Sequence, residues 1–128
     1  MTIQPINTPL AAQPLGHYSQ AQTVNGLVYL SGILPVQIDG TVNSELDFTA
    51  QSELVLQNAT AILKEAESDL DHVVKSTIYI VDIKKWCVFD KVYARHFGDH
   101  KPARAVAPVV NLHHNFKIEI EMIAQVKA

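Results

Sequence analysis

The sequence predicts a mixed α+β fold, in which two helices pack on one face of a mixed β-sheet within a single domain of residues 1–128. Two segments carry apolar residues at three- and four-residue spacings, the pattern of an amphipathic helix. The segments around them are rich in β-branched residues, and one contains an Asn-Gly turn. One sheet with both helices on the same face is the simplest packing of these elements.

A β-hairpin is predicted within residues 24–36. Asn25 and Gly26 are favoured at the centre of a tight hairpin turn, and the apolar run that follows them has strand composition. Ser31 and Gly32 interrupt that run. A glycine inside a strand often marks a bulge or a place where another group approaches the backbone closely, so Gly32 is a candidate contact point.

The first helix should begin near Asp47, and the segment 69–71 with its two aspartates should end it. Strand 72–81 follows. A second helix is predicted from Asp82, a plausible N-cap, to Gly98, a typical stop. The expected core faces are Phe48, Val55, Ala59, Ile62, Leu63 and Ala66 on the first helix, and Trp86, Phe89, Tyr93 and Phe97 on the second.

Two strands, at about 103–110 and 117–126, complete the predicted sheet. Side chains alternate along a strand, so in the last one an apolar set points to one face and a charged set to the other. The apolar set is Ile118, Ile120 and Met122, and the charged set is Lys117, Glu119 and Glu121. The face away from the helices, with Val106, Val109 and neighbouring apolar groups, is predicted to be an oligomerisation surface.

Composition limits the classes of function. Apolar residues make up 48% of the chain, charged residues 18%, and the net charge is -3, so no basic surface for nucleic acid is expected. The N-terminus lacks the features of a signal peptide, and no apolar run approaches the ~20 residues that span a bilayer. We therefore expect a cytoplasmic protein without membrane contact. Cys87, the only cysteine, is interpreted as a small packed residue.

Arg104 is the most informative charge. It follows Pro102 and precedes a long apolar run, so its guanidinium needs a partner. A planar, always protonated guanidinium can hold a carboxylate through two hydrogen bonds. Two interpretations stay open at this level: Arg104 anchors a small acid, or it forms an internal ion pair.

Neither a metal centre nor a nucleophilic serine is predicted. The chain has six histidines, but His113 and His114 are adjacent and would diverge on a strand. His96 and His100 have a helical spacing that Gly98 interrupts. Ser31 lies in a strand and not in a nucleophile elbow.

Five stretches together resemble the reactive-intermediate deaminase family, also called RidA/YjgF. The resemblance implies a chorismate-mutase-like fold, a homotrimer with a central barrel of sheets, and hydrolysis of 2-imino acids or their enamine tautomers to 2-keto acids and ammonia without a cofactor. A small carboxylate is then the expected substrate. The stretches are Leu15-Gly16-His17-Tyr18-Ser19-Gln20-Ala21, Leu30-Ser31-Gly32-Ile33-Leu34-Pro35-Val36, Tyr93-Ala94-Arg95-His96-Phe97, Pro102-Ala103-Arg104 and Lys117-Ile118-Glu119-Ile120-Glu121.

The resemblance also implies roles for individual residues. Arg104 would bind the substrate carboxylate, and Glu119 would orient the attacking water and handle its protons. Glu119 suits this role if its pKa is raised, which the sequence leaves open because the side chains of its apolar neighbours point to the opposite face. Ser31 and Gly32 would line the cleft, with Tyr18 contributed across a subunit interface.

Four departures from the family pattern concern the site. Ala107 stands where a cysteine is common, so only its backbone would serve in substrate binding. Ile33 replaces a frequent glutamine, and Asp90 a frequent asparagine. His113 and His114 replace a Leu-Pro step, and they either line the cleft near the substrate side chain or form a solvated turn.

Three alternative functions stay open at this level. A chorismate-mutase-type enzyme would need further clustered arginines, which the chain lacks. A regulatory module could use the Arg104 cleft only to sense 2-keto acids. RNA cleavage, which has been linked to the family, fits poorly with the net charge of -3.

Overall fold

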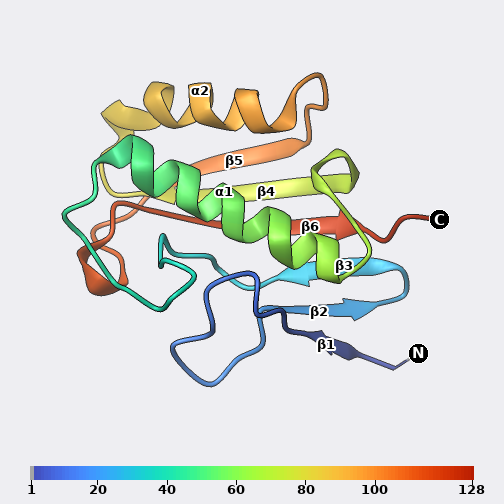
Figure 1. The fold of residues 1–128 in the computed structure, drawn as a ribbon. Coiled ribbons are helices and arrows are strands. Elements are labelled where there is room, and N and C mark those ends of the chain that lie inside the picture. The colour runs from blue at the N-terminus through green and yellow to red at the C-terminus, as the bar shows by residue number, and fades with distance from the viewer. Residues whose placement is uncertain (1) are drawn as a thin grey trace.

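The computed structural model describes residues 2–128 and contains one sheet and two α-helices (Figure 1). Short 3-10 turns lie at Leu70–His72, Ile83–Lys85 and His113–Asn115. The helices are α1 (Phe48–Glu65) and α2 (Trp86–Phe97), and the strands are β1 (Gln4–Ile6), β2 (Ala21–Val24), β3 (Leu27–Leu30), β4 (Val73–Ile80), β5 (Ala103–Pro108) and β6 (Ile118–Gln125).

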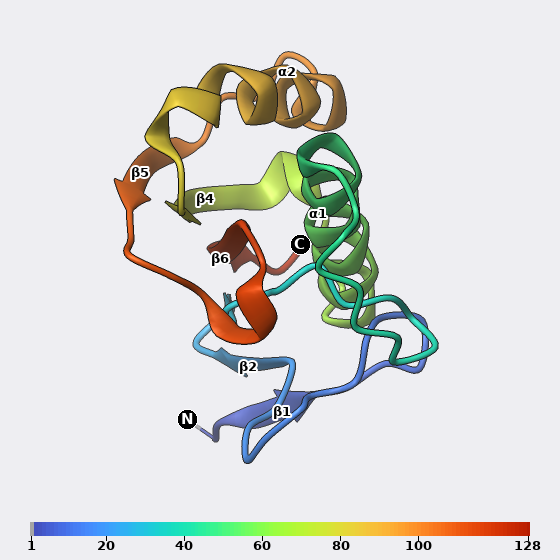
Figure 2. The same ribbon diagram turned by 90° about the vertical axis from the view of Figure 1, so that its left-hand side faces the viewer.

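The strands are ordered β1-β2-β3-β6-β4-β5, so β1 and β5 form the two edges. Among the strands of residues 2–128, only β4 and β5 pair in parallel, and α2 supplies the crossover between them. Figure 2 shows both helices on the same side of the twisted sheet. The predicted α+β domain with a mixed sheet and a one-sided helix layer is confirmed. The trimeric barrel stays a prediction.

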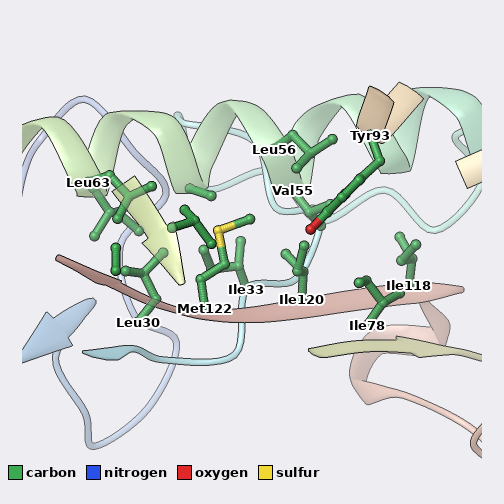
Figure 3. Close-up of a cluster of buried hydrophobic side chains, with 14 of the residues drawn as sticks. Leu30, Ile33, Val55, Leu56, Leu63, Ile78, Tyr93, Ile118, Ile120 and Met122 are labelled. Carbon is green, nitrogen blue, oxygen red and sulfur yellow. The ribbon is translucent and has the colours of Figure 1, made fainter. Parts of the chain in front are cut away.

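The core lies between the helices and the sheet (Figure 3). Ile118 and Ile120 of β6 are fully buried there, while Glu119 between them points to the other face of the sheet, as the alternation predicts. Burial of each large aliphatic side chain stabilises the fold by roughly 1.5–3 kcal/mol. This packing fixes the register of β6 and therefore the position of Glu119.

Helix α1 begins as predicted but ends earlier. The side chain of Asp47 accepts a hydrogen bond from the backbone N–H of Ala50 at 2.8 Å, which caps the helix. Its last residue is Glu65, and Glu67 adopts a left-handed conformation with φ 59°. Asp69, predicted to break the helix, instead precedes the following 3-10 turn. The helix stops because the left-handed residue turns the chain back on itself.

Three expectations for α2 are wrong. Asp82 caps the 3-10 turn before the helix, which itself begins at Trp86. Trp86 is 40% exposed and Cys87 is also exposed, because the first side chain of α2 that reaches the core is Phe89 in the next turn. The other predicted core positions of this helix, Tyr93 and Phe97, are buried.

The outer strands also differ from expectation. Strand β1 was not predicted, and it is a short edge strand that contains Pro5. Val106 of β5 packs against the core on the helix side, so it does not contribute to the uncovered face. Ala103, Ala105 and Ala107 occupy that face of β5 instead.

Within residues 2–128, neither helix combines the length and the apolar character required to cross a membrane.

Candidate functional site

Glu119 projects from β6 against the backbone of Gly32. A Cβ atom placed on Gly32 would lie 2.9 Å from a carboxylate oxygen of Glu119, which is closer than real Cβ atoms come to other atoms. Ile33 forms a bridge with Ile120, and this pairing holds the Gly32 segment beside β6. The glycine inside the predicted strand therefore does mark a close approach, and the approaching group is the Glu119 carboxylate.

Burial raises the pKa of the Glu119 carboxyl above its usual value. The neighbouring carboxylate of Glu121 acts in the same direction, while His113 opposes it by stabilising the negative charge. Glu121 accepts a hydrogen bond from the Tyr79 hydroxyl at 2.5 Å, and this bond raises the Tyr79 pKa. A carboxyl with a raised pKa holds a proton more readily than an ordinary glutamate, which suits a group that accepts and returns a proton.

A cleft of about 320 Å³ opens beside Glu119. This volume lies within the range of small-molecule sites. Besides Glu119, four residues predicted for the site line the cleft: Tyr18, Ser31, Gly32 and His113. Leu15, Gly16, Leu34 and the second histidine complete its wall. The lining residues are Leu15, Gly16, Tyr18, Ser31, Gly32, Leu34, His113, His114 and Glu119.

Tyr18 is half exposed, and its hydroxyl oxygen accepts a hydrogen bond from the N–H of Leu15 at 3.3 Å. The Ser31 hydroxyl donates to the carbonyl of Ser19 at 2.6 Å, and its N–H donates to the carbonyl of Gln20 at 3.0 Å. Ser31 thus ties the loop that carries Tyr18 to the end of β3. This loop brings Tyr18 to the same cleft as Glu119 within one chain.

His113 and His114 form a turn and also line the cleft. His114 has φ 58° and Asn115 has φ 59°, so the chain reverses sharply here. The two interpretations left open by the sequence are therefore not exclusive. The turn leads directly into β6, so it sets where the imidazoles lie relative to Glu119.

Arg104 lies in another part of the structure and does not line the Glu119 cleft. On β5 it is aligned with Ser76 of β4, which is aligned with Met122 of β6, and these side chains face the helices. Glu119 is aligned with Tyr79 on the opposite face. One chain therefore does not bring Arg104 and Glu119 together. Ala107 faces the same side of the sheet as Tyr79, on the edge strand, and does not line the Glu119 cleft.

The Arg104 guanidinium is held by α2. Its Nη1 donates to Asp90 Oδ1 at 2.6 Å, and its central carbon lies 5.0 Å from the centroid of the Tyr93 ring. Both open interpretations of Arg104 have support here: the ion pair exists, and the guanidinium also lines a cavity of about 460 Å³. The sequence indicated that Arg104 needs a partner but not that the partner is Asp90.

Among residues 2–128, the structure contains no group of three or more His, Cys, Asp or Glu side chains suited to holding a metal ion.

Comparison with known proteins gives a consistent result over nearly the whole chain. A family model described as endoribonuclease L-PSP matches residues 8–126. The mitochondrial protein MMF1 of Saccharomyces cerevisiae is 39% identical over 123 residues, which are 96% of this chain and 84% of that protein. The putative regulator AldR of Lactococcus lactis is 40% identical over 119 residues, 92% of this chain and 94% of AldR.

Solved structures agree with these relatives. RidA from an Antarctic Psychrobacter superposes with a TM-score of 0.91 at 33% identity, covering 96% of this chain and 99% of that one. Escherichia coli TdcF with bound serine superposes with a TM-score of 0.90 at 30% identity, covering 98% and 99%.

Proposed function

Because the chain belongs to the endoribonuclease L-PSP family, in which the RidA/YjgF proteins are its relatives, we propose that it hydrolyses 2-imino acids or their enamine tautomers to 2-keto acids and ammonia. The observation that carries the proposal is the Glu119 carboxyl: its pKa is raised, it lies against Gly32, and it lines a ligand-sized cleft, which supports a role in proton transfer.

The chemistry needs few groups. A protonated imine is already an electrophile, so the ionised Glu119 removes a proton from a water that attacks carbon C2 and forms a carbinolamine. The protonated Glu119 then returns the proton to the nitrogen. Glu119, ionised again, takes the proton of the carbinolamine hydroxyl as the C–N bond breaks and the carbonyl forms, and it passes that proton to the departing ammonia, which leaves as ammonium with no net change in protons on the enzyme. Tyr18 and His113 supply polar groups that orient the substrate.

The substrate carboxylate requires a cation, and we propose that Arg104 of a second copy of this chain supplies it. Arg104 lies on an edge strand, where another copy can approach, and it faces away from the Glu119 of its own chain. Tyr18 shares the cleft of its own Glu119, so Arg104 is the group contributed across the interface. A homotrimer, as the resemblance implies, would form three such sites.

Assembly is testable separately. The uncovered sheet face carries Tyr29 and Ile123 beside charged groups such as Glu121. Light scattering at micromolar concentration should give the mass of a trimer. A monomer would contradict both the trimer and the shared site.

A regulatory module that binds 2-keto acids without turnover is the second candidate. AldR is described as a putative regulator, and TdcF was crystallised with serine, a small carboxylated molecule. The same cleft and the same arginine would serve for binding alone. Cleavage of RNA, which the family description names, has less support because the net charge of -3 provides little attraction for phosphates.

The deciding assay generates 2-iminobutanoate in situ with a separate dehydratase and follows the release of keto acid with and without this protein. Glu119→Gln should keep keto-acid binding and lower turnover by about 10²- to 10⁴-fold. Arg104→Lys should weaken binding by roughly tenfold or more, because lysine lacks the planar fork. Binding without acceleration by the wild type would favour the sensor, and full activity of Glu119→Gln would refute the mechanism.

A further inference from the structure

The pairing of Arg104 with Asp90 goes beyond what carboxylate binding requires. The Tyr93 ring already supports the guanidinium from one side, and the Tyr93 hydroxyl is fixed in turn by a 2.8 Å hydrogen bond to the buried Ser76. Asp90 adds a second support through Nη1 at 2.6 Å. Together these contacts fix the direction of the guanidinium relative to α2.

Asp90 also places a full negative charge beside the cation. The hydrogen bond uses only one of the N–H donors of the guanidinium, so the others can still bind a ligand. A neutral acceptor such as an amide oxygen could make the same bond. Compared with a neutral acceptor, the Asp90 carboxylate makes the same hydrogen bond and in addition repels further negative charge near Arg104.

Other charges around Arg104 do not remove this effect. Lys101 lines the same cavity but is exposed, where solvent screens its charge. The His100 ring is engaged with the carbonyl of Val73 at 2.7 Å. Asp90 is in direct contact with Arg104, with side chains that are 42% and 24% exposed, so among the charges of its own chain it acts most strongly on an anion bound to Arg104.

We propose that Asp90 is a specificity-determining residue that restricts the site to ligands with a single carboxylate, by opposing the second negative charge of a dicarboxylate. This inference rests on the proposed function in that it takes Arg104 as the carboxylate anchor. A ligand with one carboxylate replaces solvent on the free N–H donors. A ligand with two brings an additional charge toward Asp90 and is bound more weakly.

The test compares binding of two probes, 2-oxobutanoate with one carboxylate and 2-oxoglutarate with two, by calorimetry on the intact protein. Asp90→Asn keeps a hydrogen-bond acceptor and removes the charge. It should tighten 2-oxobutanoate binding by about 3-fold and 2-oxoglutarate binding by about 10-fold or more, with a smaller difference at high salt. Asp90→Ala, which also removes the acceptor, should gain less for both probes because Arg104 loses its support.

Asp71→Asn is the matched control. Asp71 is exposed in the 3-10 turn before β4, so this substitution removes the same charge as Asp90→Asn but at a position away from Arg104. It should leave the ratio of the two affinities unchanged. If Asp90→Asn also leaves that ratio unchanged while both probes bind, Asp90 is a structural ion-pair partner only and the inference is overturned, whereas the proposed function stands. If Asp90→Asn shifts the ratio of the two affinities but the wild type does not deaminate imines, the inference about Asp90 stands and the proposed function is overturned. Failure of both probes to bind the wild type and Asp90→Asn would overturn both.

Discussion

Replacing Gly32 by alanine should displace the Glu119 carboxylate without unfolding the protein. The added Cβ would lie 2.9 Å from a Glu119 oxygen, whereas ordinary contacts begin at 3.4 Å, so the carboxylate must move by about 0.5 Å (3.4 minus 2.9). The contact is with the end of a flexible side chain, which can move. Gly32 also lacks the left-handed conformation that would strain an alanine.

The substitution should therefore reduce activity and not stability. A misplacement of 1 Å can lower a rate by about a hundredfold, so a shift of half that size should lower the deamination rate by roughly tenfold, equivalent to about 1.4 kcal/mol. Stability should be unchanged or slightly higher, because alanine restricts the unfolded chain more than glycine does. Keto-acid release reports the rate, and thermal unfolding monitored by circular dichroism reports stability.

Gly16→Ala is the matched control. Gly16 lines the same cleft, but its added Cβ would lie 3.5 Å from the Tyr18 ring, which is ordinary contact. Its effect on the rate should be much smaller. In a Glu119→Gln background, Gly32→Ala should add little further loss, because both changes act on the same group. Equal rates for Gly32→Ala and Gly16→Ala, or fully additive losses in the double variant, would refute the assignment of Glu119.

Three further predictions concern pH, the helix cap and the histidines. The raised pKa of Glu119 means that activity falls as pH decreases through that pKa and the base becomes protonated, and a pH profile of kcat should lose this acid limb in Glu119→Gln. Asp47→Ala removes the hydrogen bond to the Ala50 N–H and should lower the free energy of unfolding by about 1 kcal/mol in urea titrations, with the activity of the folded protein retained. Replacing His113 and His114 by alanine should change the ranking of imino-acid substrates, and an unchanged ranking would leave them only the role of a turn.

Local features of the fold were predictable because neighbouring residues determine them. The Asp47 cap, the apolar face of α1 and the alternation around Glu119 follow from spacing and side-chain chemistry within a few residues. The exposure of Trp86 was not predictable in this way, since periodicity shows which face of a helix is apolar but not where the helix first meets the core.

The composition of the site depended on contacts between distant residues. Arg104 and Asp90 are separated by fourteen positions, and their contact follows from the packing of α2 over β5. The alternation of β6 indicated the face of Glu119, but the opposite face of Arg104 required the register of β4 with its two neighbours. Gly32 was the exception, because a glycine within a strand pattern indicated a close approach before the approaching group was known.

The opposite orientation of Arg104 and Glu119 has a consequence for mixtures of defective chains. If each site takes its arginine from one copy and its glutamate from the next, a chain lacking Arg104 and a chain lacking Glu119 are each inactive alone but can complement one another. In rings assembled at random from equal amounts of the two, about one site in four would receive both intact residues. Co-expression of two inactive alleles would then restore activity in the cell, so the unit on which a mutation acts is the interface between neighbours and not the individual polypeptide.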